Sequence, residues 1–384
     1  MESYDVVVVG LGGAGSASAF HLARSGVRVL GLERFGPLHA QGSSHGRTRI
    51  YRTAYYEGPA YVPLTLRAQV LWRELEAASD APIIRKTGGL MIGTRESAPV
   101  TGALRSAGSH SLTHELLSAD QIDDRFPQFR VARGEVAVWE PEAGALFPEN
   151  CLRAHSLGAV AAGAELHYGE AVRAWSAASG SIEVRTAGAA YRARSLVVTA
   201  GSWTSTLVPD LVLPLQIERQ FVFWFPSTEP ELVRPDRMPV FIWDHGPIGQ
   251  TYGLPDFGDG VKIGSWGTTV VARPEDTERV VHESDAQPAR EFARTRLRGV
   301  EPRERAGTTC LYTLTPDRDF VIDRHPRLPN VVIVSACSGH GFKFTSVLGE
   351  IVARLVHGEE TGYDLAPFRL ARFTGAPAQS LSGG

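Results

Sequence analysis

A chain of 384 residues is long enough for two or three domains of about 150 residues each, which excludes a peptide hormone or a single small module. Hydrophobic residues make up 43% and charged residues 21%, a balance that excludes a largely disordered chain. The formal net charge is −3, so the overall charge provides no positive electrostatic field that would attract nucleic acid or an anionic membrane. We therefore expect small-molecule partners.

Cysteine usage and the N-terminus bear on the compartment. The three cysteines, Cys151, Cys310 and Cys337, are odd in number and far apart, so they predict neither a disulfide framework nor a metal-binding pair. Residues 1–5 contain two acids and no basic residue, unlike a secretory signal. No window reaches about 18 uninterrupted apolar residues, so we expect no membrane-spanning helix. These features predict a cytoplasmic protein without a metal site.

The first third of the chain begins with a strand, a helix and a second strand. Residues 4–9 form an apolar, β-branched run, typical of a strand buried on both faces of a parallel sheet. Residues 16–25 have helical composition, and residues 27–32 predict a second buried strand. This order is that of a βαβ unit with a parallel sheet.

A glycine pattern lies between the first strand and the helix. Gly10, Gly12 and Gly15 follow the GxGxxG spacing, and Glu33 stands at the end of the second strand. Such glycines permit a tight turn and close approach of the backbone to a pyrophosphate, while an acid at this distance accepts hydrogen bonds from a ribose. The fingerprint predicts dinucleotide binding, but it does not separate NAD from FAD.

Later segments again predict a helix and buried strands, so we expect an α/β fold with a Rossmann-like dinucleotide-binding domain that is discontinuous in sequence. Residues 151–162 predict a helix, and residues 195–200 and 330–335 predict further buried strands. Segments with alternating pattern and turn residues lie between them and predict a second, substrate domain on an antiparallel sheet. The expected domains are 1–85, 149–214 and 321–384 for the dinucleotide, and 86–148 and 215–320 for the substrate.

Lysine is scarce in this chain. Only Lys86, Lys262 and Lys343 are lysines among 39 basic residues. Replacement of lysine by arginine is tolerated on a solvated surface, so the lysines that remain are enriched at sites where a compact ammonium is needed. Lys262 and Lys343 are therefore candidate functional residues, whereas we expect only structural pairing for Lys86.

Several stretches of the sequence together resemble those of one known protein family. They are residues 42–52, 139–144, 261–264, 310–313 and 338–344. With these stretches the chain resembles, nearly end to end, the monomeric sarcosine oxidase and N-methyltryptophan oxidase family of FAD-dependent amine oxidases. The resemblance implies FAD as the dinucleotide and a monomeric protein.

The resemblance also implies how the cofactor is held. Cys310 lies where the family attaches its flavin through a thioether, which implies covalent FAD. Further cofactor contacts are implied for Arg34, Ser43, Thr48, Gly339, Gly341 and Lys343. The Gly339-His-Gly341 sequence predicts a tight turn that opens a helix toward the flavin, whose N-terminal dipole would stabilise the anionic reduced ring.

The residues implied in catalysis come from four separate segments. Lys262 matches the family lysine at the flavin ring, where a fixed cation stabilises the charge that develops on O2. His45 and Arg49 are expected beside the flavin, where they assist attachment or tune its potential. Tyr252 and Tyr312 match aromatic positions near the substrate, although core packing of both rings is an equally simple interpretation.

Arg52 and Lys343 match the pair that holds the substrate carboxylate in the family. Trp266 stands where the family has a histidine near the substrate amine, so we expect it to shape the substrate pocket. Its large π-face could pack on an aromatic or cyclic substrate and puts sarcosine itself in doubt.

The function expected from the sequence is FAD-dependent oxidation of an N-methyl amino acid to an imine, which water hydrolyses while O2 is reduced to hydrogen peroxide. Oxidation of a cyclic imino acid of the proline or pipecolate type is the alternative. An NAD-dependent dehydrogenase and a non-catalytic FAD-binding protein are the remaining alternatives; neither needs Cys310, Lys262, Arg52 and Lys343 together.

Overall fold

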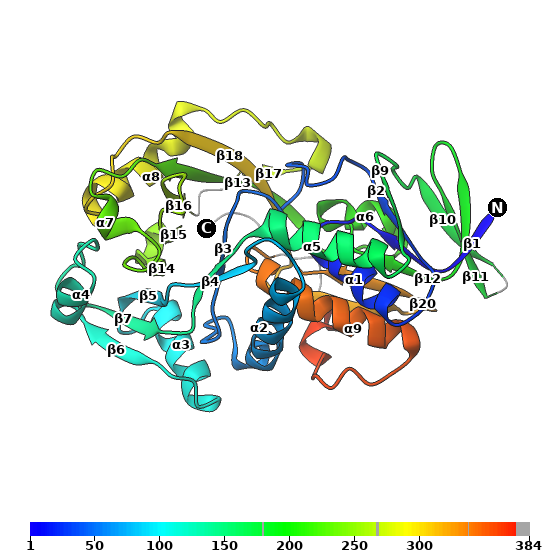
Figure 1. Ribbon diagram of the computed structural model, residues 1–384, viewed down its shortest axis with the longest axis horizontal. Helices are drawn as coiled ribbons and strands as arrows, with labels where there is room; N and C mark the ends of the chain where they lie inside the picture. Colours follow the sequence, from blue (N-terminus) through cyan, green and yellow to red (C-terminus); the bar gives the residue numbers. More distant parts are fainter. Residues whose placement is uncertain (179, 266–268, 337, 374–384) are drawn as a thin grey trace.

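The computed structural model describes residues 1–178, 180–265, 269–336 and 338–373. Figure 1 shows an elongated molecule with a large β-sheet toward each end. Trp266 and Cys337 lie outside the described residues. No helix within the described ranges is long and apolar enough to cross a membrane.

The first sheet has a parallel core, with the strand order β10-β11-β12-β1-β2-β9; β20 pairs with β12, and β19 pairs with β20. The expected strands at 4–9, 27–32, 195–200 and 330–335 are all present in it, so the predicted βαβ architecture is confirmed. The parallel pairs include Val6 with Ser195 and Val6 with Val29. The strands are β1 (Glu2–Val9), β2 (Val29–Glu33), β9 (Glu165–Tyr168), β10 (Ala174–Ala178), β11 (Ser181–Arg185), β12 (Ala190–Val198), β19 (Val321–His325) and β20 (Leu328–Ser335).

The strand β1 is apolar on both faces, and the four helices named below cover one of the two faces of this sheet. Val6 and Val8 pack in the core formed with α1 and α9, whereas Val7 and Val9 belong to a separate core on the opposite face. Alternation of side chains along the strand explains this division. The covering helices are α1 (Gly13–Arg24), α2 (Val62–Ala77), α5 (Pro148–Ala161) and α9 (Thr345–His357).

The second sheet has nine strands, and its strand order is β17-β13-β16-β15-β14-β5-β7-β6, with β18 paired to β13. Its pairs are antiparallel as expected, except that β14 and β5 run parallel. These two strands come from distant parts of the chain, so no hairpin dictates their direction. Its strands are β5 (Gly89–Thr94), β6 (Glu115–Ser118), β7 (Glu135–Glu140), β13 (Gln216–Phe225), β14 (Val240–Asp244), β15 (Gln250–Leu254), β16 (Val261–Ser265), β17 (Thr269–Val271) and β18 (Ala306–Leu314).

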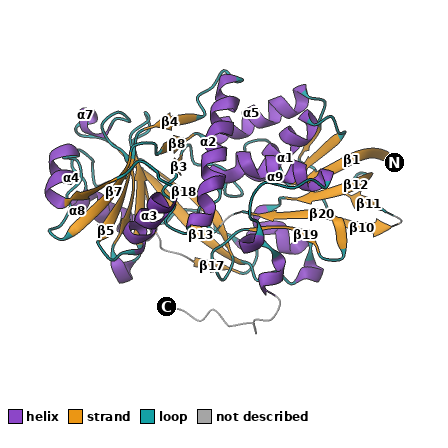
Figure 2. Ribbon diagram, turned by 90° about the horizontal axis from the view of Figure 1, so that it is seen from below, coloured by secondary structure: helices purple, strands orange, loops and turns teal. Residues whose placement is uncertain are grey.

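Helices also pack around the second sheet (Figure 2). An aromatic core lies beneath α8 and includes Phe223, Phe241 and Trp243. The helices of this half are α3 (Ala98–Ser109), α4 (Ala119–Arg125), α7 (Pro230–Val233) and α8 (Glu283–Arg296), and α6 (Thr204–Leu207) follows β12.

Two features join the halves. A small sheet of β3 (Arg49–Tyr51), β8 (Gly144–Leu146) and β4 (Ile84–Lys86) lies between the two large sheets. The end of β18 reaches the first half, where the amide of Ser338 donates to the carbonyl of Thr313 over 2.9 Å. These connections bring β18 beside the glycine turn that follows β1. The division of the chain into two domains at the expected boundaries is a proposal.

Candidate active site

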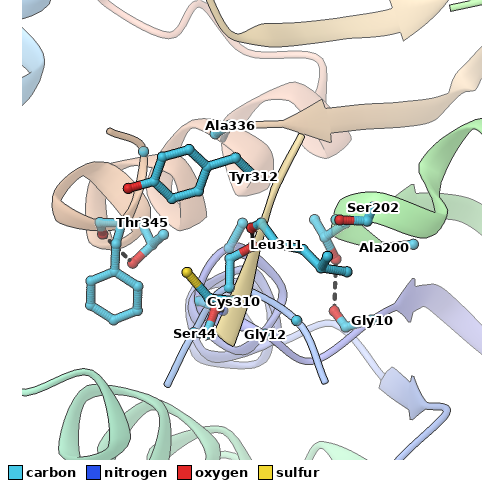
Figure 3. A pocket seen from close by; sticks show the side chains of 18 of the residues that line it. Gly10, Gly12, Ser44, Ala200, Ser202, Cys310, Leu311, Tyr312, Ala336 and Thr345 are labelled. Carbon is cyan, nitrogen blue, oxygen red and sulfur yellow. Dashed lines mark hydrogen bonds between the residues drawn. The ribbon is translucent and has the colours of Figure 1, made fainter. Parts of the chain in front are cut away.

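A cavity of about 830 Å³ runs between the two halves. Its wall includes the glycine turn after β1, the end of β2, the 42–52 segment, β15 and β18. Figure 3 shows part of this wall, with Cys310, Leu311 and Tyr312 of β18 among the labelled residues. The cavity is long enough to combine a nucleotide groove with a substrate pocket, and its two ends have different chemistry.

The turn leaves no room for side chains at two of the three glycines of the GxGxxG pattern. Gly10 has φ +90°, and a Cβ there would lie 2.8 Å from the carbonyl oxygen of Thr199. A Cβ on Gly15 would lie 1.7 Å from the carbonyl oxygen of Gly10, so the start of α1 packs directly on the turn. Gly12 faces a more open space, where the nearest atom, Ser44 Oγ, is 3.4 Å away. This is the arrangement expected of a pyrophosphate site.

The acid after β2 lies in the cavity wall, as the fingerprint predicts. Glu33 accepts hydrogen bonds from the amides of Leu11 (2.8 Å) and Phe35 (3.0 Å), and His39 Nε2 lies 3.3 Å from it. Burial alone raises the pKa of Glu33, but the contacts with His39, Phe35 and Leu11 outweigh it and lower the pKa below its usual value. The carboxylate therefore stays ionised, with lone pairs left for a ribose hydroxyl.

Arg34 lies in the same end of the cavity wall and reaches across to the other half of the molecule. Its guanidinium contacts Glu275 over 2.6 Å and lies over the ring of Trp203 at 5.6 Å. The Trp203 indole N–H donates to the same carboxylate over 2.7 Å. These three side chains form a polar bridge beside the nucleotide end.

Cys310 and Tyr312 point to the same side of β18, away from Leu311 (Figure 3). Both line the cavity, and the hydroxyl of Ser43 donates to the carbonyl of Leu311, which ties the 42–52 segment to the strand. Burial raises the pKa of the Cys310 thiol, and the nearby Arg49 and Lys262 cations oppose that rise. The thiol is free and faces a cationic wall.

Lys262 in β16 is only 2% exposed and lies behind the 42–52 segment. Its Nζ donates to the carbonyls of Gly46 (2.8 Å) and Thr48 (2.7 Å) and lies 5.8 Å from the ring centre of Trp224. Burial lowers the pKa of this ammonium well below its usual value, and the charge of Arg49 lowers it further. An excess positive charge is therefore held here at a cost in solvation.

Arg49 and His45 flank this lysine. The Arg49 guanidinium donates to the carbonyls of Thr48 (2.8 Å) and Ser43 (2.7 Å) and also lines the cavity. His45 is buried, and its Nε2 has no hydrogen-bond partner. Burial, helped by the charges of Arg49 and Lys262, lowers the pKa of His45 to about 3, so its imidazole is neutral.

Arg52, also 2% exposed, carries further positive charge into the opposite end of the cavity. One amino group bonds Glu57 at 2.6 Å, and the guanidinium lies over the rings of Tyr55 (4.1 Å) and Tyr56 (4.3 Å). Its Nε and second amino group have no hydrogen-bond partner. Buried guanidinium donors without partners are costly, so they point to a ligand with acceptor oxygens.

Lys343 lies close to Arg52 on the short turn Phe342–Phe344 before α9. Its Nζ donates to the carbonyl of His340 over 2.7 Å. Burial and the charge of Arg52 together lower the pKa of Lys343 to about 7, and the charge of Glu57 opposes this lowering. Gly339 before it has φ +77°, and a Cβ there would lie 2.7 Å from the Tyr312 ring.

Tyr252 and Tyr312 lie in the cavity wall beside these cations. Burial raises the pKa of Tyr252 to about 12, with a contribution from Cys310, while a hydrogen bond with Tyr312 opposes the rise. Both phenols therefore stay protonated at neutral pH. They can donate hydrogen bonds to a bound ligand but do not serve as ready bases.

The cavity thus contains the expected residues Gly10, Gly12, Glu33, Arg34, Ser43, Arg49, Arg52, Tyr252, Cys310, Tyr312, Gly339, Gly341 and Lys343. Gly15, His45, Thr48 and Lys262 lie behind the described wall and act on the cavity through packing or charge. Trp266, the expected substrate residue, falls outside the described residues. No cluster of metal-ligating side chains occurs among the residues described.

Sequence reasoning missed three members of the site: Glu57, Tyr56 and His340. Glu57 is the acid that pairs with Arg52. The ring of Tyr56 stacks on the Arg52 guanidinium, and its hydroxyl donates to Gln250 over 3.0 Å. The carbonyl of His340 accepts a hydrogen bond from Lys343. A signal was available for Glu57, since an acid five residues from a buried arginine is a natural partner. For His340 the Gly339-His-Gly341 sequence predicts only a turn.

The residues present fit a dinucleotide at one end and an anionic ligand at the other. The glycine turn leaves a cradle that side chains would fill, and Glu33 lies at its far side. The unpartnered atoms of Arg52 lie at the other end of the same cavity. A dinucleotide would be held by the turn, Glu33 and Arg34, with its reactive ring toward Cys310.

Comparison with known proteins adds to this geometry. Residues 5–355 match the family described as FAD dependent oxidoreductase. The chain is 42% identical over 382 residues to the monomeric sarcosine oxidase of Streptomyces avermitilis, covering 98% of this chain and 99% of that protein. It is 36% identical to the N-methyl-L-tryptophan oxidase of Citrobacter koseri, covering 97% and 99%.

Solved structures have the same architecture. NikD, described as an unusual amino acid oxidase essential for nikkomycin biosynthesis, superposes with a TM-score of 0.84 at 27% identity, covering 96% of this chain and 98% of that one. Glycine oxidase from Geobacillus kaustophilus superposes with a TM-score of 0.84 at 21% identity, covering 98% and 100%. The second likeness is one of fold.

Proposed function

This chain belongs to the family of FAD-dependent oxidoreductases that includes the monomeric sarcosine oxidases, and we propose that it oxidises the N-methyl group of an N-methyl amino acid. The observation that carries the proposal is the pair of buried cations, Arg52 and Lys343, at the substrate end of the cavity, where the Nε and one amino group of the Arg52 guanidinium have no hydrogen-bond partner. Such a pair suits one carboxylate, which every N-methyl amino acid has.

The secondary amine loses two electrons and two protons to become an imine, water adds to the imine, and the products are the primary amino acid and formaldehyde. Bound FAD would accept the two electrons and pass them to O2, which becomes hydrogen peroxide. The family match favours this chemistry over an NAD-dependent dehydrogenase and over a non-catalytic binding protein.

The substrate end orients the amine. The guanidinium of Arg52 offers two donors to the carboxylate, and the Lys343 ammonium adds a point charge. Tyr252 and Tyr312 donate hydrogen bonds from protonated phenols on the neighbouring wall. No side chain here need act as a strong base, because fixing the amine against the acceptor ring supplies much of the acceleration. For Trp266, which lies outside the described residues, the proposal that it selects the substrate side chain rests on the sequence alone.

Lys262 serves the second half of the reaction. O2 gains negative charge as it accepts the first electron, and a fixed ammonium in a water-poor site stabilises that charge. The neutral His45 and the cationic Arg49 complete this region, where they tune the electron affinity of the ring. Ser43, Thr48 and Gly341 belong to the two segments that would enclose the ring, and they would hold the backbone there.

We further propose that the flavin is covalently attached through Cys310, in a protein that acts as a cytoplasmic monomer. The free thiol faces the cavity beside Arg49 and Lys262, which favour its ionised form. Acid precipitation should leave the yellow colour with the wild-type protein and release it from Cys310→Ala. A Cys151→Ala variant is the matched control, since that buried thiol lies in the α5 core and should leave attachment unchanged.

The test of the activity is anaerobic reduction of the flavin. Sarcosine, N-methyl-L-tryptophan, L-proline and L-pipecolate are added separately, and the visible flavin band is followed. We expect an N-methyl amino acid to bleach it, with formaldehyde formed in equal amount. Bleaching by L-proline or L-pipecolate alone would replace the proposal with oxidation of a cyclic imino acid, and a protein that none of the four reduces would overturn it.

The role of Lys262 is tested in the same apparatus. Lys262→Met should slow reoxidation of the reduced flavin by O2 by at least 100-fold while it changes anaerobic reduction much less. Lys86→Met is the control, because that lysine pairs with Glu142 on the surface. Equal slowing of both half-reactions would contradict the assignment.

A further inference from the structure

The backbone at residues 46–48 has an unusual shape that the proposed chemistry does not by itself explain. Gly46 has φ +94° and Arg47 has φ +68°. Positive φ is unfavourable for a residue with a side chain, so Arg47 needs compensating contacts. The segment also closes on itself, since the amide of Thr48 donates to the carbonyl of Gly46 over 2.8 Å.

One carboxylate supplies those contacts. Glu149, in the first turn of α5, accepts the amide of Gly46 over 2.8 Å and the amide of Arg47 over 3.0 Å, both at the same oxygen. A carboxylate that receives two backbone amides makes strong, charge-assisted hydrogen bonds. Glu149 therefore fixes two successive amide groups of the 46–48 segment.

The carbonyls of this segment are the partners of Lys262. Its Nζ donates to the carbonyls of Gly46 and Thr48, at 2.8 and 2.7 Å. The amide of Gly46 is held by Glu149 and its carbonyl by Lys262, so the carboxylate and the ammonium act on one short backbone unit. Arg49 also donates to the carbonyl of Thr48, over 2.8 Å.

We propose that Glu149 is a positioning residue for Lys262: it fixes the 46–48 backbone, which in turn aims the ammonium that promotes reduction of O2. The inference rests on the proposed function for the role of Lys262. Glu149 is not part of the described cavity wall, so it touches neither the substrate nor the cofactor groove. It should therefore affect the O2 half-reaction and leave amine oxidation nearly unchanged.

A simpler role for Glu149 would be stabilisation of α5, because acids in the first turn favour the helix dipole. Glu149→Gln and Glu149→Ala separate the two roles. The glutamine amide oxygen can still accept both backbone amides, whereas alanine removes the acceptor. Asn150→Ala is the matched control, because Asn150 is the next residue of the same turn and donates to the carbonyl of Pro82 over 2.9 Å.

The first measurement follows reoxidation by O2 after chemical reduction with dithionite, which requires no amine substrate. Glu149→Ala should slow reoxidation about tenfold, Glu149→Gln should stay within threefold of wild type, and Asn150→Ala should match wild type. Anaerobic reduction by the best amine should change less than twofold in all three. Wild-type reoxidation in Glu149→Ala, or equal slowing of both half-reactions, would overturn the proposal.

The second measurement needs no turnover and uses the scarcity of lysine. Holoenzyme is labelled with acetic anhydride, and the acetylation of each lysine is followed by mass spectrometry. Lys262 should be protected in the wild type, since it is 2% exposed, and Lys86, at 54%, is the internal reference. Glu149→Ala should raise labelling of Lys262 relative to Lys86 at least fivefold, and Glu149→Gln should not. Unchanged protection in Glu149→Ala would overturn the proposal.

A failure of the proposed function can be distinguished from a failure of the inference about Glu149. If no amine reduces the wild type, the substrate class is wrong, but the reoxidation and labelling results still report on Glu149. If Lys262→Met reoxidises as fast as the wild type, the role of Lys262 and this inference are both wrong.

Discussion

The two ends of the cavity are built in different ways. At the nucleotide end, the contacts come from backbone geometry: Gly10 adopts a positive φ, Gly15 packs directly on the turn, and Gly12 leaves space. At the substrate end, they come from charged side chains held away from water, above all Arg52 and Lys343.

The nucleotide end is therefore specified by a local stretch of sequence, whereas the substrate end is assembled from distant segments of the chain. The glycine turn lies within six consecutive residues, so sequence spacing alone specifies it. The cations of the other end, Arg52 and Lys343, come from the 42–52 segment and the turn before α9, and only the fold brings them together. Burial lowers the pKa of Lys262 and of Lys343, so each cation is held at a cost that an anionic ligand or developing negative charge can offset.

Gly15→Ala should break the nucleotide end and cause the largest loss. The added methyl would lie 1.7 Å from the carbonyl oxygen of Gly10, so the start of α1 has to move away from the turn. We expect a protein without bound flavin, measured as the ratio of flavin to protein absorbance after purification. Gly108→Ala in α3 is the control, because nothing lies within 4 Å of its added methyl. A full flavin content in Gly15→Ala would contradict the role of the turn.

Arg52→Met should break the substrate end and leave the nucleotide end intact. Loss of charge-assisted hydrogen bonds to a carboxylate costs about 3 kcal/mol, a factor of roughly 150 in kcat/KM. Flavin content should equal that of the wild type. A kcat/KM within threefold of wild type would show that the substrate carboxylate binds elsewhere. Arg73→Met, at an exposed arginine on α2, is the control for loss of a positive charge.

The pH dependence of carboxylate binding should sharpen the picture of the substrate end. Burial lowers the pKa of Lys343 to about 7, while the pKa of Arg52 lies above its usual value and that of Glu57 below. His340 is neutral, because burial lowers its pKa to about 4. Lys343 is then the group of this set that loses charge near neutrality.

A carboxylate without an amine, such as acetate, should therefore bind best below pH 7. Its Kd should rise by up to about tenfold per pH unit above that value, as the ammonium loses its proton. Titration of the flavin spectrum with acetate from pH 5.5 to 9 measures this, with a flat profile expected for Lys343→Met. A wild-type Kd that is constant over the range would show that Lys343 does not face the bound carboxylate.

The sequence predicted the first sheet better than the second. The strands at 4–9 and 195–200 are continuous apolar runs, and both lie in the parallel core where such runs belong. The parallel pairing of β5 with β14 was missed, because the two strands are far apart in the chain and no turn signal joins them. Periodicity predicts a strand but not its neighbour when the connection is long.

The contacts of individual site residues were also only partly predictable from the sequence. Arg52 was found through its motif, but its stacking between Tyr55 and Tyr56 depends on how the segment folds back on itself. Glu149 had no signal at all, because it is one acid at the start of an ordinary helix. Its contacts with the amides of Gly46 and Arg47 exist only once α5 lies beside the 42–52 segment.

The polar bridge at the nucleotide end should give the smallest effect. Arg34 and Glu275 are 39% and 46% exposed, and exposed pairs of this kind contribute about 0–1 kcal/mol. Glu275→Gln should therefore weaken FAD binding no more than about fivefold, measured by fluorescence titration in a Cys310→Ala background, where the flavin is not attached. The glutamine can still accept the indole N–H of Trp203, which limits the loss further. A loss of a hundredfold would mean that a side-chain bridge, and not the backbone turn, holds the nucleotide, and the contrast between the two ends would no longer stand.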